Sequence, residues 1–103
     1  MQDHRAPTAD VTLDDVHAAQ IRLRGIIRPT PTRLADSLSR ALNRSIYLKP
    51  EHLQRAGSFK TRGAFNRVLT MSAAERELGT IAVSAGNHAA SLALAAQIGR
   101  AHV

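Results

Sequence analysis

An apolar segment between residues 80 and 97 places the strongest constraint on the fold. Thr80-Ile81-Ala82-Val83-Ser84 carries apolar side chains on both faces, which is typical of a buried parallel strand. A turn over residues 85–88 follows, and residues 89–97 then predict a nearly all-apolar helix. Such a helix has no polar face to leave in water, so other elements must cover it on several sides. We therefore expect this segment to lie inside a layered protein of strands and helices.

The first half of the chain predicts two helices. Thr12-Leu13-Asp14-Asp15 has the form of a capping box and starts an amphipathic helix over residues 12–25. Arg28-Pro29-Thr30-Pro31-Thr32 ends it, because each proline forces the residue before it out of the helical region. A second short helix is predicted over residues 34–42, and Asn43 can close it in the left-handed conformation.

Strands and helices then alternate. The β-branched and aromatic run over residues 46–49 predicts a short strand. A helix is expected from Ser58, and a second capping box at residues 72–75 opens a short helix that Gly79 closes. The helix from Ser58 would bury one stripe of side chains, namely Phe59, Phe65, Val68 and Leu69. This order predicts an α/β architecture, a parallel sheet with flanking helices. Two strands do not form a stable sheet, so we expect an incomplete domain.

Charge and composition exclude several classes of function. The net charge is +6, but the arginines are scattered from Arg5 to Arg100 and aromatic residues make up only 3% of the chain. We therefore expect no nucleic-acid partner. No apolar run approaches the roughly 20 residues that span a bilayer, and the N-terminus lacks the apolar stretch of a secretory signal. Without cysteine or metal-ligand spacing, we expect a cytoplasmic protein with no metal and no membrane contact.

The segment Gly57-Ser58-Phe59-Lys60-Thr61-Arg62-Gly63-Ala64 places Lys60 in the first turn of a predicted helix. A cation is unfavourable there because the helix N-terminus is already positive. That positive end, together with burial, would favour the neutral amine that a Schiff base with an aldehyde requires. A solvated surface lysine explains the same residues, so this motif alone leaves both interpretations open.

A second motif, Ser84-Ala85-Gly86-Asn87-His88-Ala89, follows a predicted strand and opens a helix. Ligands of open α/β sheets bind outside the carboxyl ends of strands, and a helix N-terminus favours an anion. Gly86 lets the backbone approach a ligand, and Asn87 can donate and accept hydrogen bonds without charge. An ordinary turn with Asn87 as helix cap explains the motif equally well. His88 lacks an acid or nucleophile partner, so we expect a packing or supporting role.

Together the two motifs resemble the threonine dehydratases (threonine ammonia-lyases), enzymes of the tryptophan-synthase-β-like fold that depend on pyridoxal 5'-phosphate (PLP). Pro50–Ala64 is similar to the family's PLP attachment segment, K-x-E-x-x-Q-x-x-x-S-F-K-x-R-G-A, and Ser84–Ala89 matches its S-A-G-N-H-A. Thr30–Leu34 is similar to its T-P-L segment. The resemblance covers residues 12–97 and implies an incomplete fragment of a two-domain PLP enzyme.

The resemblance also implies a role for each motif residue. Lys60 would bind PLP as a Schiff base and later take the α-proton of a small amino-acid substrate. Phe59 would pack beside the cofactor, and Asn87 would hydrogen-bond its 3′-oxygen. The loop that grips the substrate carboxylate would consist of Ser84, Ala85, Gly86, Asn87 and His88. The implied reaction eliminates water from L-threonine or L-serine, giving 2-oxobutanoate or pyruvate and ammonia.

Two departures from the family pattern bear on the reaction. Related serine racemases carry a serine at the position of Ala85, where it is the second acid/base, so Ala85 favours elimination over racemisation. Ala90-Ser91 replaces the usual Gln-Gly, and both residues are small enough to preserve close helix packing. The alternatives are a serine racemase or another lyase or synthase of the same fold. A different class, a non-enzymatic small basic binding module, also stays open.

The predicted organisation has three parts. Residues 1–11 form a flexible lead-in, residues 12–71 the first part of the large PLP domain, and residues 72–103 the start of the small domain. Family members are several times longer, and their phosphate-binding glycine-rich loop lies further along the chain. We therefore expect the 103-residue chain alone to be inactive and to show no stable cofactor absorbance. The full-length protein would be a homo-oligomer that acts in isoleucine biosynthesis.

The last residues carry a separate hypothesis. Ile98-Gly99-Arg100-Ala101-His102-Val103 is what a common sequencing-adapter DNA would encode if read in frame. The native sequence would then end near Gln97. The alternative is a natural helix end at Gly99, and the sequence leaves both open.

Overall fold

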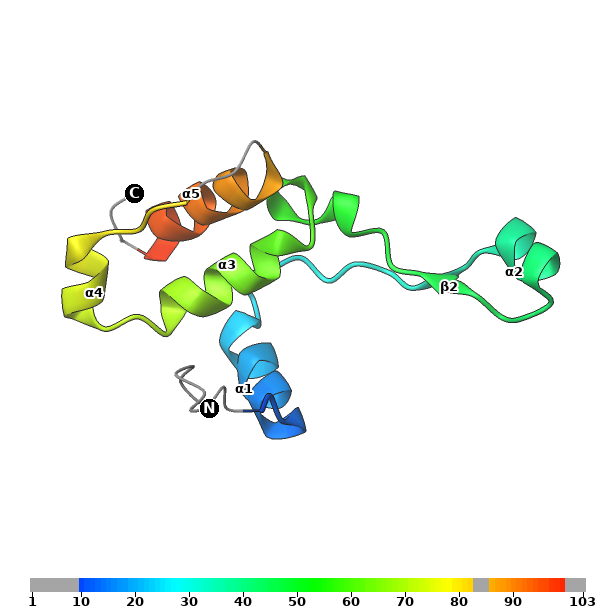
Figure 1. Ribbon diagram of the computed structural model, residues 1–103, viewed down its shortest axis with the longest axis horizontal. Helices are drawn as coiled ribbons and strands as arrows, with labels where there is room; N and C mark the ends of the chain where they lie inside the picture. The colour runs from blue at the N-terminus through cyan, green and yellow to red at the C-terminus, as the bar shows by residue number, and fades with distance from the viewer. Residues whose placement is uncertain (1–9, 83–85, 100–103) are drawn as a thin grey trace, which may run out of the picture.

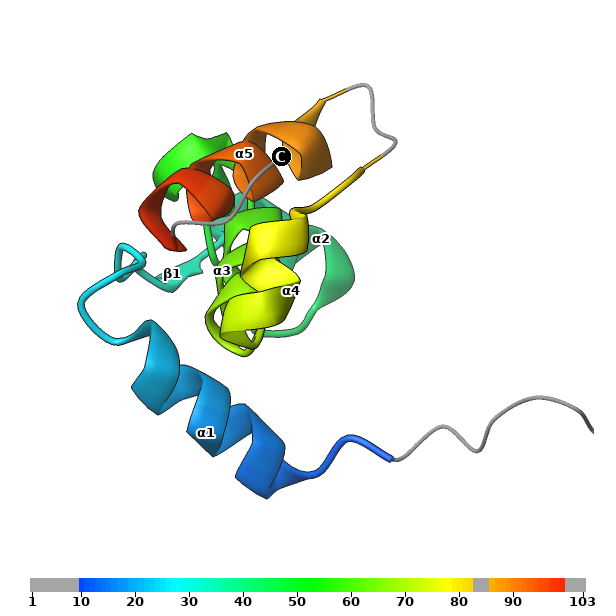
Figure 2. The same cartoon turned by 90° about the vertical axis from the view of Figure 1, so that its left-hand side faces the viewer.

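The structure, a computed structural model, describes residues 10–82 and 86–99. Its elements follow in the order α1 (Leu13–Leu23), β1 (Arg33–Leu34), α2 (Asp36–Leu42), β2 (Tyr47–Leu48), the 3-10 turns η1 (Glu51–Leu53) and η2 (Arg55–Gly57), α3 (Lys60–Leu69), α4 (Ala73–Leu78) and α5 (Asn87–Gly99). In Figure 1, α3 and α5 lie side by side, and α2 with the two strands extends away from them. Figure 2 shows α1 running outward from this pair.

The core lies between α3 and α5. Phe65 and Val68 are fully buried, which confirms two members of the predicted stripe. Phe59 is 64% exposed, so its predicted burial is wrong. The reason is that α3 begins at Lys60, two residues later than predicted, and Thr61 and Ala64 take the inward positions of its first turns. The buried apolar residues of the described part are Leu23, Ala64, Phe65, Val68, Met71, Leu92, Ala95 and Ala96.

The helix ends confirm the sequence predictions that rest on capping chemistry. Thr12 and Asp15 form the predicted capping box at α1, with the Asp15 N–H donating to Thr12 Oγ1 at 3.2 Å. Ser72 and Glu75 form the second one at α4. Asn43 closes α2 in the left-handed conformation, with φ 50°. Local side-chain chemistry therefore fixes these boundaries.

The sheet differs from the prediction. β2 confirms a strand within residues 46–49, but its partner is β1, and the two run antiparallel with Arg33 opposite Leu48. Residues 80–82 form no strand. Ile81 is 93% exposed while Ala82 is half-buried against the core, so the predicted strand with two buried faces is wrong for the part that the structure describes. A parallel strand is buried only where neighbouring strands and helices cover it. Among residues 10–82 and 86–99, no strand forms a ladder with this segment.

Pairing of β1 also explains why α2 begins at Asp36 rather than at residue 34, since Arg33–Leu34 is taken into the ladder. None of the helices in the described ranges is both long enough and apolar enough to cross a membrane.

Candidate functional site

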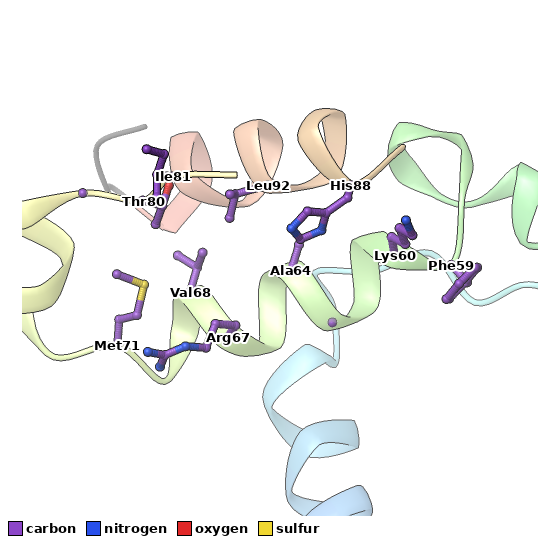
Figure 3. A pocket seen from close by; sticks show the side chains of 12 residues that line it. Phe59, Lys60, Ala64, Arg67, Val68, Met71, Thr80, Ile81, His88 and Leu92 are labelled. Carbon is purple, nitrogen blue, oxygen red and sulfur yellow. The ribbon is translucent and has the colours of Figure 1, made fainter. Parts of the chain in front are cut away.

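Lys60 lines an open cavity of about 540 Å³ between α3 and the start of α5. The volume is within the roughly 300–1,000 Å³ typical of small-molecule sites. Figure 3 shows the His88 ring reaching from α5 toward α3, close to Ala64 and Lys60. The charged residues that line the cavity in the described part, Lys60 and Arg67, are both cationic, and no carboxylate lines it there. The cavity therefore suits an anionic ligand with an apolar body.

Lys60 is the first residue of α3, which confirms the prediction that it lies in the first turn of a helix. Its side chain is exposed. The neutral amine was expected from the positive helix end and from burial, and the structure shows only the first of these two conditions. Its backbone N–H donates to Ser58 Oγ at 3.3 Å. Within residues 10–82 and 86–99, no hydrogen-bond acceptor contacts the Lys60 amine. The amine is therefore accessible from the cavity.

A tight turn leads into Lys60. Ala56 and Gly57 are both left-handed, with φ 58° and 77°, and the Gly57 N–H donates to the Gln54 carbonyl at 2.9 Å. The buried Gln54 side chain accepts from the Arg28 N–H at 2.8 Å and donates to the Arg28 carbonyl at 2.6 Å. These bonds tie the turn to the segment that precedes β1, which fixes where α3 begins.

The turn allows a matched pair of glycine substitutions. Gly57→Ala should lower the free energy of unfolding by about 1 kcal/mol, because a Cβ is strained at this positive φ. Gly63→Ala should raise it by about 0.5–1 kcal/mol, since Gly63 lies inside α3 and no atom is within 4 Å of an added Cβ. Urea denaturation followed by circular dichroism measures both. Equal effects of the two substitutions would contradict the positive φ of Gly57 in the turn before α3.

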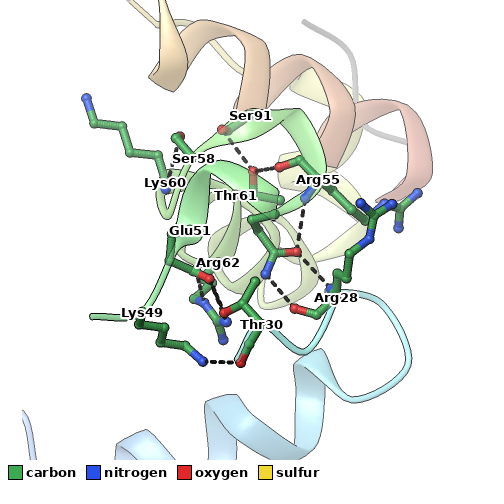
Figure 4. A network of polar contacts seen from close by, with 11 residues as sticks. Arg28, Thr30, Lys49, Glu51, Arg55, Ser58, Lys60, Thr61, Arg62 and Ser91 are labelled. Carbon is green, nitrogen blue, oxygen red and sulfur yellow. Dashed lines mark hydrogen bonds and ion pairs between the residues drawn. The ribbon is translucent and has the colours of Figure 1, made fainter. Parts of the chain in front are cut away.

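Glu51 and Arg62 form an ion pair beside this turn (Figure 4). Arg62 Nε donates to Glu51 Oε1, and a second guanidinium nitrogen donates to Glu51 Oε2 at 3.2 Å. The Thr30 hydroxyl also donates to Glu51 Oε2, and Lys49 Nζ donates to the Thr30 carbonyl at 2.9 Å. Chiefly because Arg62 donates to it, the pKa of Glu51 falls to about 2, although partial burial opposes this.

This low pKa predicts how stability depends on pH. The folded protein holds the Glu51 proton less tightly than the unfolded chain, so the ion pair stabilises the fold above pH 4.5, the ordinary pKa. That contribution is lost as the pH falls from 4.5 to about 2. We expect the wild type to be more stable than Glu51→Gln at neutral pH, with the difference vanishing near pH 2. Thermal midpoints of both proteins measured against pH test this, and a pH-independent difference would contradict it.

Two buried hydroxyl groups join α3 to α5. Thr61 Oγ1 donates to the Arg55 carbonyl and lies 3.2 Å from Ser91 Oγ, and both side chains are fully buried. The predicted close packing at Ser91 is thus confirmed. The hydroxyl pair itself was missed, although Thr61 has the helical spacing of the buried Ala64, Phe65 and Val68 and could have been found from it.

The second motif is only partly described. Gly86 and Asn87 are exposed at the start of α5, and the Ala90 N–H donates to the Gly86 carbonyl at 3.1 Å. Asn87 is therefore the first helical residue rather than the cap. His88 is half-buried and lines the cavity together with Phe59 and Lys60, whereas Gly86 and Asn87 do not line it. Ser84 and Ala85 lie outside the described residues. No group of three or more potential metal ligands occurs in the described ranges.

Comparison with known proteins identifies the family. The profile of a family described as "Pyridoxal-phosphate dependent enzyme" matches residues 23–103. L-threonine ammonia-lyase of Thermotoga maritima is 47% identical over 88 residues, which cover 85% of this chain and 22% of that protein. The crystal structure of a threonine deaminase from T.th. is similar with a TM-score of 0.75 and 38% identity, over 89% of this chain and 32% of that one. The structure of serine racemase from Dictyostelium discoideum has a TM-score of 0.82 and 33% identity, over 88% and 30%.

In sequence and in structure alike, the matches cover most of this chain but only part of each relative. The chain spans about a quarter of the length of the curated relatives that it matches. The resemblance inferred from the two motifs is confirmed, because the family profile covers most of the chain and the similar structures share its fold. The chain therefore belongs to the family of pyridoxal-phosphate-dependent enzymes.

Proposed function

We propose that Lys60 is the residue that holds PLP and that the protein deaminates L-threonine, or L-serine, by elimination of water. The observation that carries this proposal is the Lys60 amine at the first residue of α3, accessible from a cavity with a cationic lining. Lys49, the other lysine of the chain, donates instead to the Thr30 carbonyl. Lys60 is thus the better placed of the two to react with an aldehyde.

The residues present fit this cofactor. PLP is an aromatic aldehyde that carries a phosphate, so it needs an amine, an apolar wall and positive charge. Lys60 supplies the amine, Arg67 supplies positive charge, and Ala64, Val68 and Leu92 supply apolar lining. Lys60 would hold the cofactor covalently and Phe59 would lie beside it. The Asn87 amide, which lies outside the cavity lining and one residue before His88, would turn toward the cofactor and donate a hydrogen bond to its 3′-oxygen.

The chain's own residues would divide the work of the reaction. When bound, PLP supplies a ring that delocalises the negative charge left at the substrate Cα. Once the substrate amine has taken its place on the cofactor, the freed Lys60 Nζ would take the proton from Cα. The loop of Ser84, Ala85, Gly86, Asn87 and His88 would hold the substrate carboxylate through hydrogen bonds at the N-terminus of α5. The β-hydroxyl leaves as water and a water hydrolyses the product, so L-threonine yields 2-oxobutanoate and ammonia without an oxidant.

The relatives support elimination and also a second candidate. Among similar proteins are an L-threonine ammonia-lyase, a threonine deaminase and a serine racemase. Ala85 stands where serine racemases carry their second acid/base, and this residue favours elimination. The family membership gives no support to a non-enzymatic binding module.

A chimera tests the proposal. In the T. maritima L-threonine ammonia-lyase, the 88-residue matched segment is replaced by the corresponding segment of this chain, which supplies Lys60 and the loop before α5. We expect the chimera to release ammonia and 2-oxobutanoate from L-threonine and to form little D-serine from L-serine. A folded chimera that binds PLP and releases no ammonia would refute the proposal. D-serine formation without ammonia release would favour the racemase.

A further inference from the structure

Resting on the proposed function, we propose that the Glu51–Arg62 ion pair positions Lys60. The pair holds the first turn of α3 in place, and this keeps the Lys60 side chain directed into the cavity. Arg62 and Glu51 would contact neither substrate nor cofactor, so they are positioning residues. None of the roles proposed above for the two motifs includes them.

The start of α3 needs such support because its own sequence supplies only one long capping bond, from the Lys60 N–H to Ser58 Oγ at 3.3 Å. α1 and α4 each have a capping box, whereas the residue before α3, Phe59, makes no side-chain cap bond. The first turn of α3 also has no acidic residue, and its first residue is a cation at the positive end of the helix. Missing caps cost about 1 kcal/mol each. The first turn should therefore fray unless tertiary contacts hold it.

Two consecutive side chains provide those contacts. Thr61 is fixed between the Arg55 carbonyl and Ser91, and Arg62 is fixed to Glu51. Successive residues of a helix point about 100° apart, so fixing Thr61 and Arg62 determines the direction in which the Lys60 Cα–Cβ bond leaves the helix. Figure 4 shows the Lys60 side chain extending away from the polar network.

The Glu51 end of the pair is itself anchored. The Glu51 side chain is only 14% exposed, and it accepts from Thr30 as well as from Arg62. Solvent-exposed ion pairs contribute little to the free energy of unfolding. A bidentate arginine bonded to an anchored carboxylate also fixes the orientation of its guanidinium group. The segment that carries Lys49 and Glu51 is bonded twice to Thr30, so the carboxylate that Arg62 contacts is held in place.

The test compares Glu51→Gln, Arg62→Gln, their combination and Arg62→Lys in the chimera. Each single Gln variant should lower kcat about tenfold while KM changes less than about twofold, since misplacing a reacting group slows the reaction at unchanged binding. The double variant should be no worse than either single variant, because both remove one pair. Arg62→Lys should recover part of kcat by keeping one charged bond. Glu75→Gln, which removes a carboxylate that only caps α4, is the matched control and should leave kcat unchanged.

Unchanged kcat in both Gln variants, or equal losses in Glu75→Gln, would overturn the positioning role while leaving the proposed function standing. If a folded wild-type chimera bound PLP and released no ammonia, the proposed function would fail on its own. Hydrogen exchange in the 103-residue chain then decides the positioning role. Faster exchange at the Thr61 and Arg62 amides in Glu51→Gln, with no change in Glu75→Gln, supports it, and unchanged exchange overturns it.

Discussion

Replacing Lys60 with alanine is expected to lower ammonia release by the chimera by about 10³-fold or more, because the same amine holds the cofactor and moves the α-proton. The alanine removes both functions at once. The cavity wall remains, because Lys60 is exposed and contributes nothing to the core between α3 and α5. The thermal midpoint should therefore change little. Steady-state ammonia assays with L-threonine, together with circular dichroism, measure both quantities.

Lys49→Ala is the control for this experiment, since Lys49 is the only other lysine of the chain. It loses a hydrogen bond to the Thr30 carbonyl, so we expect a fall of less than about tenfold, comparable to the loss of one supporting contact. Equal losses for Lys49→Ala and Lys60→Ala would argue that charge, and not the Lys60 amine, limits the reaction. Full ammonia release by Lys60→Ala would contradict the assignment outright.

Phe65→Ala is expected to unfold the 103-residue chain. Its ring is fully buried between α3 and α5, with the Arg55 guanidinium 5.7 Å from the ring centroid. Truncating a buried phenylalanine costs about 3–5 kcal/mol, which is a large part of the stability of a small domain. Far-ultraviolet circular dichroism should show a loss of helix, and urea denaturation should show no cooperative transition.

Phe59→Ala is the matched control for Phe65→Ala, since Phe59 is 64% exposed. Its effect on the free energy of unfolding should stay within about 0.5 kcal/mol, as for other surface substitutions. A similar loss of stability in both variants would mean that the core does not lie where α3 and α5 meet.

Local chemistry made much of the secondary structure predictable. The two capping boxes and the left-handed Asn43 depend only on residues three or four apart, and all three are confirmed. Contacts that join distant residues were harder to predict. β1 forms because Arg33–Leu34 meets Tyr47–Leu48, and residues 80–82 remain irregular because no described strand pairs with them. Burial of a parallel strand is a property of its neighbours and cannot be read from its own residues.

The candidate site divides in the same way. The sequence placed Lys60 in the first turn of a helix, which is confirmed, but its predicted burial and that of Phe59 are wrong. The network around Glu51 and Arg62 was not predicted, because it joins Glu51 and Lys49 to Thr30, about twenty residues earlier in the chain, and Glu51 to Arg62 in α3. Spacing along one helix carries no signal for contacts of this kind.

Several predictions from the resemblance stay predictions. The division into a first domain over residues 12–71 and a second over residues 72–103 stays a prediction. α3 belongs to the first and α5 to the second, and the contact between these helices does not test the division. The homo-oligomer, the cytoplasmic location, the part in isoleucine biosynthesis and the origin of residues 98–103 also stay predictions.

Covalent mapping of the cofactor tests the central claim most directly. The chimera is incubated with PLP, reduced with borohydride and digested, and the modified peptide is identified by mass spectrometry. The account predicts one cofactor adduct per chain, on the peptide that contains Lys60. An adduct on Lys49 or on another lysine, in a chimera that releases ammonia from L-threonine, would contradict it.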